Sequence, residues 1–210
     1  MSCRIYMDHA ATTEMLPEVR EAMEPYLREE YGNASTSYDM GVRMHDAIEE
    51  AREKIAWVID AQPEEIFFTS GGSESDNWVI KSVAGEKKNS GKHLITTRIE
   101  HHAVLRSCQY LESLGYEVTY LDVDDYGLVS AKEVVHALRE DTTLVSVMTG
   151  NNEIGTIEPI ADIGAQLRAR GIAFHTDAVQ AFGHIPLNVE QMHIDLLSVS
   201  AHKFHGPKGI

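Results

Sequence analysis

The sequence predicts an α/β fold: three layers, α/β/α, built around a mostly parallel sheet. Short apolar runs alternate with longer amphipathic runs along most of the 210 residues. The composition, 43% hydrophobic and 24% charged, is ordinary for a globular protein. Chemically distinctive residues directly follow the predicted strands, as expected where a ligand binds at the carboxyl ends of parallel strands.

The predicted elements alternate along the chain. Strands are predicted at 66–69, 93–97, 117–121, 144–148, 173–175 and 196–199. Helices are predicted between them at 73–84, 102–114, 131–138 and 160–170. An earlier helix is predicted at 47–59, where Ile48, Ala51, Ile55, Ala56 and Ile59 recur with a helical period. This alternation is typical of βαβ units, whose sheet is covered by helices on both faces.

Charge and cysteine content limit the classes of partner. The net charge of −15 argues against nucleic acid or an anionic membrane surface and is typical of a solvated acidic surface. Cys3 and Cys108 show no pairing pattern, which is consistent with a reducing compartment. The first ten residues lack a signal-peptide pattern, and no apolar run is long enough to span a bilayer. We therefore expect a cytoplasmic protein.

The segment at 69–77 joins a predicted strand to a predicted helix. Gly71 and Gly72 permit a tight turn, and Ser73 lies at or near the helix N-cap, where free N–H groups favour an anion. The segment therefore resembles a phosphate cradle, without Walker A or dinucleotide spacing. Taken alone, it is better interpreted as a glycine turn with a serine cap, in which Asp76 serves only the helix dipole.

The segment at 175–180 ends a predicted strand with a carboxylate. A buried Asp177 needs a cationic partner, and the protonated pyridine nitrogen of pyridoxal phosphate (PLP) is one. Gln180 could bond the phenolic oxygen of that cofactor. An aspartate that only caps the next turn is an equally good interpretation of this segment alone.

The segment at 199–209 places Lys203 in a loop between two histidines, directly after a hydrophobic strand. A lysine that forms a Schiff base must be partly unprotonated, and burial favours that state. Ser200 and His202 could donate to a phosphate. A solvated surface loop is the alternative, but the strand leads directly into the loop. We therefore predict that Lys203 carries PLP as a Schiff base.

Glu100, His101 and His102 also follow a predicted strand. A histidine there can stack on a cofactor ring or act as an acid or base near neutral pH. The histidines could also form a metal cluster with His175 and Asp177, but the usual ligand spacing is missing, so no metal is expected. A structural role remains the main alternative for His102.

Together these segments resemble the NifS/IscS-like cysteine desulfurases, which are class V aminotransferases of PLP fold-type I. The matching runs keep the family's order and spacing, and they lie at 6–13, 32–35, 69–77, 100–105, 151–155, 175–180, 200–203 and 206–209. Each run is weak alone, and their combination is specific.

The resemblance implies a role for each matching residue. Lys203 and His101 would be catalytic, the lysine as Schiff base and proton carrier and the histidine as stacking acid or base. Asp177 would pair with the pyridine nitrogen. Asn152 would contact the phenolic side with Gln180 and would also help to hold the substrate carboxylate. The implied cofactor-binding set is Gly72, Ser73, His101, Asn152, Asp177, Gln180, Ser200, Ala201, His202 and Lys203.

The resemblance also implies the reaction and the partners. L-Cysteine would yield L-alanine and a protein persulfide, which passes to scaffold or acceptor proteins for iron–sulfur clusters, thio-cofactors or tRNA. The implied assembly is a homodimer. Residues 1–15 would form an N-terminal arm, and residues 16–210 the PLP-binding large domain.

The sequence departs from the family downstream of Lys203. The family's sulfur-accepting cysteine, substrate-binding arginine and a phosphate-binding threonine all lie there, and the chain ends seven residues after Lys203. Neither Cys3 nor Cys108 matches that cysteine. We therefore expect a C-terminally incomplete chain that lacks the small domain and exposes apolar surface. The alternatives are an aminotransferase, a selenocysteine lyase, or an incomplete PLP-binding fragment acting as an assembly subunit.

Overall fold

A computed structural model describes residues 5–210 and contains one five-stranded sheet in which every pair of neighbouring strands is parallel. The strand order is β2-β1-β3-β4-β5. The strands are β1 (His93–Thr97), β2 (Glu117–Leu121), β3 (Thr142–Ser146), β4 (Ala173–Asp177) and β5 (Leu196–Ser198). The predicted α/β class is confirmed.

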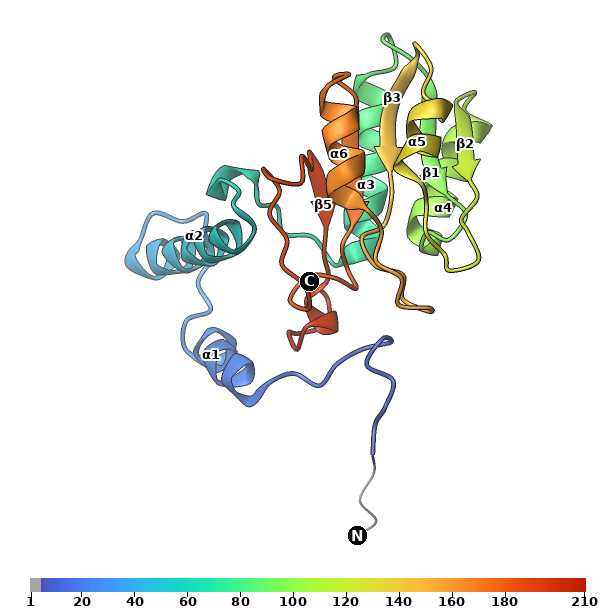
Figure 1. Cartoon of the computed structure of the whole chain (residues 1–210). Coiled ribbons are helices and arrows are strands. Elements are labelled where there is room, and N and C mark those ends of the chain that lie inside the picture. The colour runs from blue at the N-terminus through green and yellow to red at the C-terminus, as the bar shows by residue number, and fades with distance from the viewer. Residues whose placement is uncertain (1–4) are drawn as a thin grey trace.

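Helices cover both faces of this sheet (Figure 1). Helices α3 and α4 pack against each other on one face, and α5 and α6 lie together on the other. The helices are α1 (Pro17–Arg28), α2 (Asp39–Ile59), α3 (Gly72–Glu86), α4 (His102–Ser113), α5 (Ala131–Ala137) and α6 (Ile160–Arg168), with short 3-10 helices η1 (Pro63–Glu65) and η2 (Ala201–Lys203). The predicted three-layer arrangement is confirmed.

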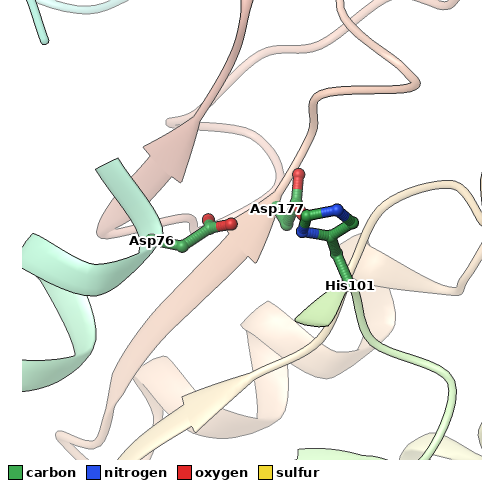
Figure 2. Close-up of side chains that lie close together, drawn as sticks. All are labelled: Asp76, His101 and Asp177. Carbon is green, nitrogen blue, oxygen red and sulfur yellow. The ribbon is translucent and has the colours of Figure 1, made fainter. Parts of the chain in front are cut away.

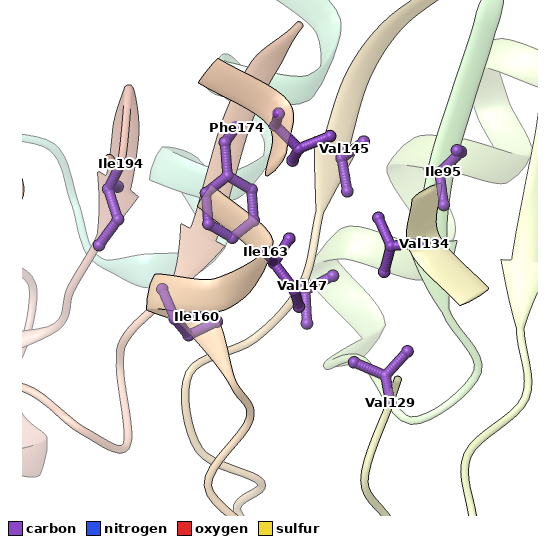
Figure 3. Packing of buried hydrophobic residues seen from close by; sticks show 10 residues of the cluster. Ile95, Val129, Val134, Val145, Val147, Ile160, Ile163, Phe174 and Ile194 are labelled. Carbon is purple, nitrogen blue, oxygen red and sulfur yellow. The ribbon is translucent and has the colours of Figure 1, made fainter. Parts of the chain in front are cut away.

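The central strands are apolar on both faces, which explains their continuous hydrophobic runs. Neighbouring residues of one strand point to opposite faces, so Leu94 packs under α3 and α4 while Ile95 packs under α5 and α6. Phe174 on β4 is fully buried against Ile163 of α6 (Figure 3). Two apolar layers therefore hold the sheet rigidly between the helices.

The predicted strand at 66–69 is wrong. These residues have no strand partner within the part of the chain that the structure describes, and Phe67 is 65% exposed. Aromatic and β-branched residues favour an extended backbone, but a strand also requires a hydrogen-bonded neighbour. Phe67 instead packs edge-on against Trp78 of α3, with 5.6 Å between the ring centroids.

The structure differs from the sequence prediction in two helices. Helix α1, which contains Pro25, was not predicted. Helix α2 begins at Asp39, eight residues before the predicted start, and Met44 in the added turns is buried and continues the helical period of the segment. None of the helices in the described range 5–210 is long and apolar enough to cross a membrane.

The order of the strands determines where a ligand can bind. The chain passes from β1 outward to β2, and then returns across β1 to β3, β4 and β5. This reversal makes the carboxyl ends of β1 and β3 a switch point, where open α/β sheets bind their ligands. The loops that follow β1, β3, β4 and β5 all begin at this edge.

Candidate cofactor site

A cavity of about 250 Å³ lies at this edge of the sheet. It is lined by the start of α3 and by residues that follow or end four of the strands: Gly72, Ser73, Asp76, His101, Met148, Gly150, Asn152, Asp177, Val179, Gln180, Ser200, His202 and Lys203. Nine of the ten predicted cofactor-binding residues are in this set. Ala201 is not, since its N–H and C=O instead bond the carbonyl of Ile210 and the N–H of Gly206.

Lys203 ends η2, and its Nζ donates a hydrogen bond to the carbonyl oxygen of Ala10. Burial lowers the pKa of this amine, although Asp177 and Asp8 oppose the change. The loop is held by the N-terminal segment, because both the N–H and the hydroxyl of Thr13 donate to the carbonyl of His202, at 2.8 and 2.9 Å. The chain therefore presents a positioned amine whose neutral form is more accessible than that of an ordinary lysine.

Asp177 is the last residue of β4 and is only 4% exposed. Its Oδ1 accepts the Val179 N–H at 2.9 Å, and no Lys, Arg or His forms a salt bridge with it among residues 5–210. Burial raises the pKa of this carboxyl, while the Val179 N–H, His101 and Lys203 favour the charged form. A buried carboxyl without a cationic partner suits a ligand that presents a positively charged group to it.

His101 is the N-cap of α4, and its ring lies beside Asp177 (Figure 2). The ring Nδ1 accepts the Ala103 N–H at 3.2 Å. A neutral imidazole in this arrangement carries its proton on Nε2. His101 is exposed and lines the cavity, so its ring is free to cover a planar group there.

The start of α3 differs from the prediction in one detail. Gly71, not Ser73, is the N-cap, with φ 124° and ψ −179°, a conformation that is essentially restricted to glycine. Ser73 is the second residue of the helix and lines the cavity with Ser200 and His202. The first N–H groups of a helix lack intrahelical partners, so this end suits an anion.

Adjacent asparagines have separate functions in the loop after β3. Asn151 is buried, with its Nδ2 donating to the carbonyl of Ile99 at 3.1 Å and its Oδ1 accepting from Glu153 and Ile154. Asn152 is left to line the cavity. Gln180 also lines it, and its Nε2 donates to the carbonyl of Ala10 at 2.7 Å.

The sequence analysis missed two buried acids at the site, Asp76 and Glu100. Asp76 is 1% exposed and points from α3 toward Asp177, so its assignment to the helix dipole alone is not supported (Figure 2). A signal was present: Asp76 precedes buried Ile80, Val83 and Ala84 by four, seven and eight residues, on the apolar stripe of the helix. Glu100 is 5% exposed and had no comparable periodic signal.

The cysteines do not add a nucleophile to the described site. Cys108 lies inside α4 and is 1% exposed. Burial raises the pKa of its thiol to about 12, so the reactive thiolate is suppressed. Cys3 lies outside the described residues.

Comparison with known proteins decides the family. The model of the aminotransferase class-V family matches residues 5–210. The chain belongs to this family. Over its whole length this chain is 54% identical to a cysteine desulfurase IscS of Dictyoglomus turgidum, and it covers 53% of that protein. It is 55% identical to a cysteine desulfurase IscS of Methanosarcina thermophila and covers 51% of that protein.

Solved structures agree with this assignment. A NifS-like protein superimposes on this chain with a TM-score of 0.96 at 44% sequence identity. The superposition covers 99% of this chain and 57% of the NifS-like protein. A structure described as SspA in complex with cysteine gives 0.95 at 44% identity, over 97% and 59%. The chain thus spans about half the length of the curated relatives it matches, and the resemblance to NifS/IscS-like desulfurases is confirmed.

Enzymes of the class-V family use PLP, and the residues of the cavity fit that group. A buried carboxyl without a cation, an amine with a lowered pKa and a helix N-terminus behind a glycine N-cap surround one space. They match the ring nitrogen, the aldehyde and the phosphate of PLP.

Proposed function

We propose that this chain is the cofactor-binding part of a PLP-dependent cysteine desulfurase, which removes sulfur from L-cysteine to leave L-alanine and a protein persulfide. The observation that carries the proposal is the convergence of Lys203, Asp177 and the N-terminus of α3 on one cavity. The names of the relatives at 54–55% identity support the choice of reaction.

PLP, when bound, supplies an electron sink that lets a proton leave the α-carbon of an attached amino acid. Lys203 provides the amine for covalent attachment, and the same amine later moves the α-proton, since its lowered pKa keeps a neutral fraction available. Asp177 accepts the ring N–H. His101 covers the ring and presents its Nε2–H to reacting groups.

The remaining predicted residues orient the two ends of the cofactor. We propose that the first turn of α3, including Gly72 and Ser73, binds the phosphate with Ser200 and His202. The amides of Asn152 and Gln180 line the phenolic side of the cavity, and Asn152 also helps to hold the substrate carboxylate. Ala201 acts only through its backbone, which shapes the turn that carries Lys203.

The arm and the assembly are part of the same proposal. We propose that residues 1–15 form an arm, of which residues 1–4 lie outside the described part of the chain, and that residues 16–210 form the cofactor domain. The bonds from Thr13 to His202 and the acceptor that Ala10 offers to Lys203 support an arm. A homodimer is supported by exposed Trp57, Phe67 and Trp78, at 85%, 65% and 52%. The scarcity of cysteine supports a cytoplasmic enzyme that delivers sulfur to acceptor proteins.

The first experiment tests cofactor attachment. The chain is loaded with PLP, reduced with borohydride and mapped by mass spectrometry. The label is expected on Lys203, and Lys203→Ala is expected to lose it, whereas Lys132→Ala, at an exposed position of α5, retains it. Labelling at another lysine would contradict the proposed attachment.

The second experiment tests the reaction. The chain is completed at its C-terminus with the matching half of a relative, loaded with PLP and given L-cysteine and excess thiol. The completed protein is expected to release L-alanine and sulfide in equal amounts, as the thiol takes the sulfur and is oxidised to its disulfide. Amino-group transfer to a keto acid in place of sulfide release would indicate an aminotransferase. Preference for selenocysteine would indicate a lyase. Attachment without turnover of any of these would indicate an assembly subunit.

A further inference from the structure

Asp76 is an acid of the cavity to which the proposed chemistry assigns no role. Its carboxyl is 1% exposed, and its Oδ1 has no hydrogen-bond partner. Ligand atoms of Asp76, His101 and Asp177 all lie within 4.8 Å of one another (Figure 2). Two buried carboxyls at this separation cannot both be charged without a large energetic cost.

No cation neutralises Asp76 in the described part of the chain. The nearest basic group is His175 on β4, whose Nε2 lies 3.7 Å from Oδ1 of Asp76. Both ring nitrogens of His175 are engaged with serine hydroxyls, those of Ser146 and Ser198, at 2.9 and 3.0 Å. The ring is fully buried, which lowers its pKa to about 3, so His175 is neutral and cannot balance an anion.

The surrounding groups favour placing the negative charge on Asp177 and the proton on Asp76. Asp177 receives the Val179 N–H and faces both His101 and Lys203, which stabilise an anion. Burial, together with the neighbouring Asp177, raises the pKa of Asp76 to about 8, although the hydroxyl of Ser198 opposes the change. Burial also raises the pKa of Glu100, and the charges of Asp177 and Asp76 add to this rise, so a third buried acid lies close to the pair.

We infer that Asp76 is a positioning residue that remains protonated and donates a hydrogen bond to Asp177, so that Asp177 stays charged and aligned for the cofactor's ring nitrogen. The expected effect of Asp76 on PLP binding rests on the proposed function. The protonation of Asp76 does not depend on it. A protonated Asp76 beside Asp177 adds no second negative charge to the site, whereas an ionised Asp76 would add one.

Two substitutions separate a neutral donor from an anion. Asp76→Asn keeps the shape and supplies an N–H, so the dissociation constant for PLP is expected to change by less than about threefold. Asp76→Leu keeps the volume and removes the donor, so PLP is expected to bind about 10- to 100-fold more weakly. Circular dichroism and thermal melting of the cofactor-free variants check that both are folded.

The outcomes are distinct. Equal loss in both folded variants would show that Asp76 acts as an anion, and unchanged binding in Asp76→Leu would show that it does not position Asp177; either result overturns the inference. If Asp76→Leu does not fold, Asp76→Ser, a smaller residue with a hydroxyl donor, is expected to bind more weakly than Asp76→Asn but detectably. If neither Asp76→Ser nor Asp76→Asn binds PLP, the inference is overturned.

Failure of the proposed function gives a different result. In that case the wild-type chain does not take up PLP at Lys203, and the protonation of Asp76 is read in the cofactor-free protein. Infrared spectra of protein labelled with ¹³C only at aspartate carboxyls are expected to show a carboxylic-acid band near pH 7 that Asp76→Asn removes. Aspartate labelling excludes Glu100, and a band that survives Asp76→Asn overturns the inference.

Discussion

Replacement of Glu100 by alanine should destabilise the protein and loosen the loop that carries His101. Oε1 of Glu100 accepts the hydroxyl of Thr97 at 2.8 Å and the N–H of Met148 at 2.9 Å, which ties the loop after β1 to the end of β3. Alanine leaves both buried donors without this acceptor. Loss of the acceptor of the fixed Met148 N–H costs about 1–3 kcal/mol. Loss of the acceptor of the rotatable Thr97 hydroxyl costs about 0.5–1.5 kcal/mol, for a total of about 1.5–4.5 kcal/mol.

Glu100→Gln is the matched variant, because its carbonyl oxygen keeps both bonds. Burial raises the pKa of Glu100 well above its ordinary value of 4.5, so the folded state holds this proton more tightly than the unfolded state. The resulting stabilisation is complete below the unfolded pKa and is lost as pH rises through the folded pKa. Wild type should therefore lose stability relative to Glu100→Gln as pH rises above the ordinary glutamate pKa of 4.5.

Urea unfolding followed by circular dichroism measures these differences. Glu86→Ala, at an exposed position of α3, serves as a surface control and should shift the free energy of unfolding by no more than about 0.5 kcal/mol. The reasoning is refuted if Glu100→Gln at about pH 5 is as destabilised as Glu100→Ala, or if Glu100→Ala unfolds like wild type.

Further predictions concern the core and its neighbours. A Cβ on Gly164 of α6 would lie 2.0 Å from the carbonyl oxygen of Met192, so Gly164→Ala should cost about 1–3 kcal/mol in urea unfolding. A Cβ on Gly85 would have no neighbour within 4 Å, so Gly85→Ala should instead raise the free energy of unfolding by about 0.5–1 kcal/mol. If Gly164→Ala also stabilised the protein, the close contact with Met192 would be contradicted. Phe174→Ala should cost about 3–5 kcal/mol by the same measurement, since the side chain is fully buried, and a loss below about 1 kcal/mol would contradict its place in the core. Alkylation of Cys108 near pH 8 should be slow in native protein and fast in urea, whereas equal rates would show an open thiol.

The local pattern was sufficient for most of the fold. Strands β1 and β2 were predicted with their observed bounds, because apolar or β-branched runs between turns carry a strong local signal. The segment at 66–69 carries a similar signal and is no strand in the structure. Strand pairing depends on neighbours that are distant in sequence, so local composition cannot decide it.

The candidate site shows the same division. Lys203, Asp177 and His101 could be named from sequence because each follows a predicted strand, and parallel strands bring their carboxyl ends to one edge. Asp76 and Glu100 could not be assigned a role in this way. Their importance comes from burial and from the groups that surround them, and these appear only when α3 and the loop after β1 are packed on the sheet.

The sequence by itself therefore determined the α/β class, the family and the residues that face the cofactor cavity, because periodicity and motif order are local properties of the chain. Only the tertiary structure decided which acids have a raised pKa and how Ala10 and Thr13 bond to the Lys203 loop. Each of these depends on desolvation or on hydrogen bonds between residues far apart in sequence, and both arise only when the chain is folded.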